Sequence, residues 1–142
     1  MTALLLANAA STLFMVGLTW FVQVVHYPLF PLVPEEGFPE YHRLHSNRTT
    51  YVVLPPMLIE IVTSFALLTD PPGDAQALVI AGAGLAAATW LLTALAAAPA
   101  HGRIGRQGLS PQLHRRLLRI SWARTLVWTA HGGVVLALLA AV

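Results

Sequence analysis

Four stretches of this 142-residue chain are almost free of charged residues and are long enough to cross a lipid bilayer. A hydrocarbon core of about 30 Å requires roughly 20 helical residues. Backbone groups left unpaired in lipid are costly, so continuous apolar stretches of this length must span it as helices. We predict an all-α, four-transmembrane-helix bundle in which residues 1–142 form a single integral membrane domain. The predicted helices cover approximately residues 3–26, 51–69, 75–98 and 118–142.

Composition supports the membrane class and excludes several kinds of chemistry. Hydrophobic residues make up 56% of the chain and charged residues 10%, a more apolar balance than that of an ordinary soluble domain. The chain has no cysteine, which excludes disulfides, thiolate zinc sites, cysteine-ligated iron–sulfur clusters and cysteine nucleophiles. No nucleophile elbow or phosphate-binding loop is present either, so the sequence does not indicate a soluble hydrolase.

The basic residues indicate how the helices are oriented. All eight are arginines, and they lie in the first and third connections or shortly after them, whereas the second connection carries only Asp70 and Asp74. Positively charged connections favour the cytoplasmic side, so both termini are predicted to face the outer side. Because the arginines follow the membrane edge, we expect lipids as their partners and no nucleic acid.

The same side of the predicted bundle carries five of the six histidines. His42 and His45 are spaced i and i+3, which places them on one face of a helical turn. His26 and His101 lie at the ends of the first and third apolar stretches. Imidazoles combined with a carboxylate suit iron, copper, zinc or manganese. We predict a transition-metal site, with iron favoured, whose ligands are His26, His42, His45, Glu60 and His101.

Two charged side chains fall inside the apolar stretches and therefore need a partner or a function. A charge in the middle of a membrane helix costs about 2.5 kcal/mol or more. Glu60 is predicted to be either a metal ligand or the ion-pair partner of Arg124. If the second helix begins at Pro55, Glu60 lies close to the histidines; if that helix is continuous and kinked, Glu60 lies deeper, nearer His131. We predict that Glu60 and Arg124 are catalytic, with Arg124 orienting a ligand or stabilising developing negative charge.

Polar residues also recur along each apolar stretch at helical spacing. Those of the first stretch fall within an arc of about 60° at 100° per residue. Such a stripe is expected to face the bundle interior and to hydrogen-bond between helices. His114 is expected at the membrane interface and His131 as a hydrogen-bonded core residue. The predicted polar seam comprises Asn8, Thr12, Thr19, Gln23, His26, Glu60, Thr63, Ser64, Thr89, Thr93, Ser121, Arg124, Trp128 and His131.

Four sequence runs resemble a widespread family of small four-helix bacterial integral membrane proteins. The runs are residues 20–28, 41–45, 55–60 and 122–128. The resemblance covers nearly the whole chain and implies a location in the bacterial inner membrane, but it brings no assigned activity. In size, hydropathy and architecture the chain is also similar to the anthrone-oxygenase-like membrane proteins, which implies oxidation of a polycyclic aromatic substrate.

These features predict a membrane metalloenzyme, an oxidoreductase or oxygenase that acts on a lipophilic small molecule. Trp20, Trp122 and Trp128 are expected to line its apolar pocket. Two alternatives are also consistent with the sequence. A b-type haem electron carrier would use His26 or His101 as an axial ligand. A non-enzymatic protein would bind or transport a metal, or assemble a complex, as a homo-oligomer packed through its small-residue helix faces.

Overall fold

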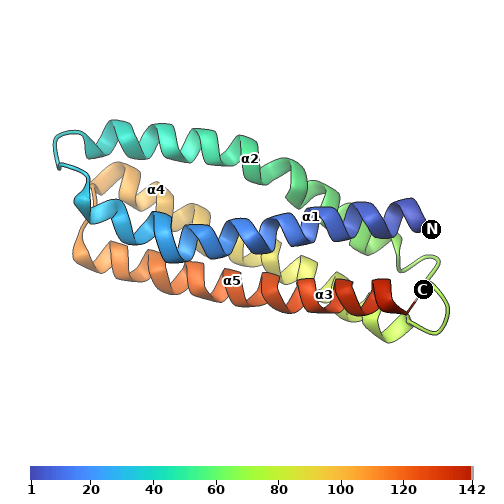
Figure 1. The fold of residues 1–142 in the computed structure, drawn as a ribbon. Helices are drawn as coiled ribbons and strands as arrows, with labels where there is room; N and C mark the ends of the chain where they lie inside the picture. Colours follow the sequence, from blue (N-terminus) through green and yellow to red (C-terminus); the bar gives the residue numbers. More distant parts are fainter. Residues whose placement is uncertain (142) are drawn as a thin grey trace.

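The computed structural model describes residues 1–141, and over that range the chain forms an all-helical bundle without strands (Figure 1). Four membrane-length helical spans are present among these residues, as predicted. Val142, at the end of the predicted fourth helix, lies outside the described residues. Figure 1 places the start of the first span and the end of the fourth at the same end of the bundle. The spans are α1 (Thr2–Phe21) with η1 (Val22–His26) and η2 (Tyr27–Leu32), α2 (Phe38–Ala66), α3 (Gln76–Leu92) with η3 (Thr93–Ala97) and α4 (Ala98–Gln107), and α5 (Pro111–Ala140).

The helices are longer than predicted at the arginine-rich end of the bundle. α2 begins at Phe38 instead of residue 51, and α5 begins at Pro111 instead of residue 118. Hydropathy marks only the part of a helix that suits lipid, whereas capping residues mark where the helix starts. The Ser110 hydroxyl accepts a hydrogen bond from the Leu113 N–H at 3.2 Å, and a proline at the first helical position is well tolerated.

Two of the spans contain a π-helical turn just before a proline. η1 precedes Pro28, and η3 precedes Pro99. A proline has no N–H to donate to the carbonyl four residues before it, and its ring collides with that carbonyl. A widened π turn accommodates this conflict, and such turns are frequent at functional sites. Here the two turns lie next to His26 and His101, at the same end of the bundle.

The predicted polar seam faces the interior. On the first span, Asn8, Thr12 and Thr19 of α1 and Gln23 of η1 are buried. The seam residues of the other spans are buried or half-buried. The Asn8 amide donates at 2.9 Å to both the Thr63 and the Ser64 hydroxyl on α2. Within lipid, which offers no hydrogen bonds, such contacts between helices fix their register.

Gly132 on α5 packs tightly against α1. A Cβ atom at this position would lie 3.0 Å from Cγ2 of Val16, whereas a Cβ at the neighbouring Gly133 would meet nothing within 4 Å. Gly132→Leu is therefore expected to lower the free energy of unfolding by about 2 kcal/mol through overpacking. The matched control, Gly133→Leu, should leave it unchanged or slightly raised, because leucine favours helix over glycine. Unfolding by SDS titration from mild detergent, followed by circular dichroism, measures both. Equal behaviour of the two variants would contradict this packing.

Candidate functional site

Four histidines from three segments of the chain lie together at the arginine-rich end of the bundle. His26 ends η1, His42 and His45 lie one turn apart on α2, and His101 lies on α4. The Nε2 atom of His26 is 2.9 Å from Nδ1 of His45, and Nε2 of His42 is 3.2 Å from Nδ1 of His101. The His45 ring centroid lies 6.2 Å from that of His42 and 5.6 Å from that of His101. The structure thus brings together four of the five predicted metal ligands, here called the histidine cluster.

Aromatic and hydroxyl side chains surround the histidine cluster. Phe30 is fully buried and packs edge-on against the rings of His26 and His45, with 5.3 Å between centroids in both cases. The Tyr27 hydroxyl lies 2.8 Å from Nε2 of His101, and the Thr49 hydroxyl lies 3.2 Å from Nδ1 of His45. These contacts limit rotation of the rings and keep one side of the cluster apolar.

Each ring-to-ring contact requires at least one neutral imidazole, the one that accepts. Each nitrogen–nitrogen hydrogen bond needs one N–H and one lone pair, and a neutral imidazole supplies one of each. In one consistent assignment, the Tyr27 hydroxyl donates to Nε2 of His101, whose Nδ1–H donates to Nε2 of His42. The remaining proton then lies on Nδ1 of His42. Neutral imidazole is also the form that binds metals.

In the described part of the chain, no three His, Asp or Glu side chains form a group arranged to hold a metal ion. Within the histidine cluster the nitrogens face one another in two pairs instead of converging on one point. Two nitrogens bound to one ion at about 2.0–2.1 Å lie roughly 3 Å apart. Each pair therefore already has the spacing of a two-nitrogen chelate, and rotation of the rings would be needed to join the pairs.

Glu60, the fifth predicted ligand, lies away from the histidine cluster. α2 runs without interruption through Pro55 and Pro56, so Glu60 is fifteen residues beyond His45, or roughly 22 Å along the axis at 1.5 Å per residue. This is the deeper of the two placements that the sequence allowed. The prediction that Glu60 joins the histidines is therefore not met in this structure, because the prolines do not start the helix.

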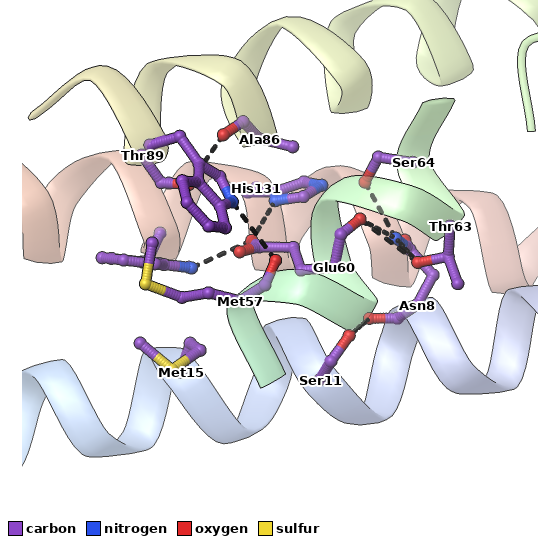
Figure 2. Close-up of polar contacts among 12 residues, drawn as sticks. Asn8, Ser11, Met15, Met57, Glu60, Thr63, Ser64, Ala86, Thr89 and His131 are labelled. Carbon is purple, nitrogen blue, oxygen red and sulfur yellow. Dashed lines mark hydrogen bonds and ion pairs between the residues drawn. The ribbon is translucent and has the colours of Figure 1, made fainter. Parts of the chain in front are cut away.

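Glu60 instead forms a buried polar centre with two residues of α5. Its Oε1 atom accepts a hydrogen bond from Nε1 of Trp128 at 2.9 Å and lies 2.7 Å from Nδ1 of His131. All three side chains are completely buried. Figure 2 shows Glu60 extending from α2 towards His131. His131 is thus a hydrogen-bonded core residue, as predicted.

The predicted ion pair between Glu60 and Arg124 does not form. In residues 1–141 the carboxylate contacts that qualify as ion pairs are Glu60–His131 and the exposed Glu40–Arg43. The Arg124 guanidinium lies 5.1 Å from the ring centroid of Trp128. The indole N–H of Trp128 donates to Glu60. Trp128 thus contacts both charged groups, and Arg124 has no carboxylate partner.

A cavity of about 900 Å³ adjoins the histidine cluster. His42, His45 and His101 contribute to its wall, together with Tyr27 and Arg124. Towards the middle of the bundle the wall is mainly apolar, with the hydroxyl groups of Thr19, Thr93 and Ser121 among its lining. At the arginine-rich end the wall includes exposed polar residues of α2. The apolar part of the lining includes Met15, Leu18, Val22, Val53, Leu54, Met57, Trp90 and Ala97.

The tryptophans are arranged differently from the prediction. Trp20 and Trp122 are exposed and pack against each other edge-on, with ring centroids 5.6 Å apart. Neither they nor the buried Trp128 line the cavity, whereas Trp90 does. The Trp90 indole also donates to the Met57 carbonyl at 3.2 Å. At 100° per residue, Trp90 lies only about 60° around the helix axis from Thr93 of the polar seam, and this spacing was the signal for its inward orientation.

Tyr27 is a functional candidate that sequence reasoning missed, and His114 contacts its backbone. His114 was predicted to lie at the membrane interface. Its Nε2 atom is 2.8 Å from the Tyr27 carbonyl oxygen. Tyr27 begins the 3₁₀ helix η2, in which backbone carbonyls accept from the N–H three residues further on. The His114 imidazole adds a side-chain contact to this carbonyl and ties the start of α5 to η2.

No protein-family model, curated protein or solved structure matches this chain. Its functional assignment therefore depends on the residues of the histidine cluster and the cavity, and on their geometry.

Proposed function

We propose that this protein is a membrane-embedded, metal-dependent oxidoreductase of the oxygenase type that acts on a lipophilic small molecule. The observation that carries this proposal is the connection between a cluster of four imidazoles and a large, mainly apolar cavity inside a membrane-length bundle. Clustered imidazoles are ligands for redox-active metals, and concave apolar sites with a few polar groups are typical of small-molecule binding.

The proposed metal ligands are His26, His42, His45 and His101, without Glu60. Nitrogen-only ligation suits iron, copper or zinc better than manganese, which prefers oxygen ligands. We keep iron as the favoured metal because it supports oxidation by O₂. A bound ion would supply the redox chemistry and an open coordination position. The chain's own contribution is to orient the imidazoles through Tyr27 and Thr49 and to exclude water with the surrounding aromatic rings.

The cavity supports a lipophilic substrate. Its volume of about 900 Å³ falls within the range of about 300–1,000 Å³ that is usual for small-molecule sites. Apolar side chains such as Leu18, Val53 and Met57 line its body, while His42 and His101 lie at one end. A bound molecule can therefore bury its apolar part and present one end to the histidine cluster.

The first test is elemental analysis with an absorption spectrum, on protein purified in mild detergent without chelators or a histidine tag. We expect close to one transition-metal ion per chain, or the same occupancy after reconstitution with Fe²⁺. A Soret band would instead indicate the haem-binding alternative. Protein that is metal-free and cannot be reconstituted with iron, copper, zinc or manganese would overturn the proposal.

The second part of this test concerns catalysis. Fe²⁺-loaded protein is expected to consume O₂ when a bacterial total lipid extract is added, and His42→Ala should abolish this uptake. His114→Ala is the matched control, because His114 lies outside the histidine cluster and contacts a backbone carbonyl. Loaded protein that binds iron but shows no histidine-dependent O₂ uptake with lipid extract would favour a non-enzymatic metal-binding role.

A further inference from the structure

We propose that the cavity binds a lipophilic acid, and that Arg124 recognises its anionic oxygen group. This inference rests on the cavity of the proposed function and names the class of its substrate. It does not depend on a bound metal, because the residue that carries it lies on α5, outside the histidine cluster.

Arg124 provides a positive charge in the wall of the cavity, within the membrane-length part of the bundle. The next residue, Thr125, donates a hydrogen bond at 3.3 Å to the carbonyl of Thr19, which places this turn of α5 level with the last turn of α1, inside the first membrane-length span. The Arg124 side chain lines the cavity. Its Nε atom is buried and has no hydrogen-bond partner. A guanidinium at such a depth is costly unless an anion or a polar group compensates it.

The carboxylates of the described residues do not neutralise Arg124. Glu60 is engaged by Trp128 and His131. Glu36 and Glu40 line the exposed part of the cavity, but Glu40 pairs with Arg43 at 2.7 Å. Neither they nor any other carboxylate in residues 1–141 lies within 4.0 Å of Arg124. The membrane part of the cavity therefore carries one guanidinium and neutral imidazoles.

The environment of Arg124 orients its guanidinium for a ligand. The Trp128 ring lies 5.1 Å from the guanidinium carbon and packs against the group, an arrangement that stabilises a cation. The Tyr27 hydroxyl also interacts with the guanidinium, while Nε remains without a hydrogen-bond partner. A guanidinium presents a planar fork of donors that matches two carboxylate oxygens. A carboxylate bound there would leave its apolar chain to follow the wall formed by Leu18, Met57 and Trp90. Charge and shape together favour an acid over a neutral lipid.

The test compares a fluorescent fatty acid with its methyl ester. cis-Parinaric acid and methyl cis-parinarate are titrated into metal-free protein in non-ionic detergent, and quenching of tryptophan emission reports binding. We expect the wild-type protein to bind the acid at least about tenfold more tightly than the ester, since a charge-assisted bidentate contact is lost in the ester. Arg124→Gln should remove this preference while leaving ester binding and helicity unchanged.

Arg119→Gln is the matched control. It removes one arginine from an exposed position on the same helix, so it should keep the preference for the acid. Arg124→Lys keeps the charge but loses the fork, and an intermediate preference is expected. Equal affinity of wild-type protein for acid and ester, or an equal loss of preference in the Arg119 and Arg124 variants, would overturn the inference. Because the protein is metal-free, these outcomes are independent of whether the histidine cluster binds iron.

Discussion

Replacing Glu60 with alanine is expected to lower the free energy of unfolding by about 2–6 kcal/mol, because it leaves two buried polar groups unpaired at a cost of about 1–3 kcal/mol each. The carboxylate accepts one hydrogen bond from Trp128 and contacts His131, and all three side chains are completely buried. Without it, an indole N–H and an imidazole remain unpaired in an interior that offers no water. SDS titration followed by circular dichroism measures the loss.

The matched variants separate this interaction from the effect of a smaller side chain. The triple variant Glu60→Leu, His131→Leu and Trp128→Phe removes all the polar partners together, so it should recover most of the stability lost in Glu60→Ala. Glu40→Ala, which removes the exposed partner of Arg43, should produce no measurable change. A Glu60→Ala protein as stable as wild type would contradict a structural role for this centre.

The fold could be predicted because lipid imposes a simple rule on the sequence. An apolar stretch in a bilayer must satisfy its backbone within a helix, so hydropathy alone identifies the four spans. The same rule placed His26, His42, His45 and His101 together, because antiparallel helices return to the same end of the bundle. The cluster could thus be located from topology alone. The two nitrogen pairs could not be predicted from topology, since they depend on the side-chain rotamers of the histidines.

The position of Glu60 depended on a choice that the sequence leaves undecided. A proline pair is equally suited to beginning a helix and to interrupting one. In the structure α2 continues through Pro55 and Pro56, and this moves Glu60 away from the histidines by several turns. The consequence extends to Arg124, which loses its predicted ion-pair partner and becomes available to a ligand. The continuation of α2 through the two prolines therefore changes the expected roles of both Glu60 and Arg124.

Joint replacement of His42 and His101 by alanine is expected to weaken metal binding by more than about 100-fold, because even residues outside the ligand set contribute 10- to 100-fold. The two rings form one of the nitrogen pairs, at 3.2 Å, and they connect α2 to α4. Metal titration of the apoprotein in detergent measures the affinity. The effect of metal on stability gives an independent measurement. At a metal concentration 100 times the wild-type Kd, the free energy of unfolding of the wild type should rise by about 2.7 kcal/mol. At the same metal concentration, that of the double variant should hardly change.

His114→Ala provides the control for this prediction, since it removes an imidazole from the same end of the bundle without touching the histidine cluster. Its contact is with the Tyr27 carbonyl, so metal affinity should remain close to that of the wild type even if stability falls. An unchanged affinity in the His42 and His101 double variant would mean that these rings are held together by hydrogen bonding alone. A loss in that variant with retention in His114→Ala would instead identify the cluster, and not histidine content in general, as the metal site.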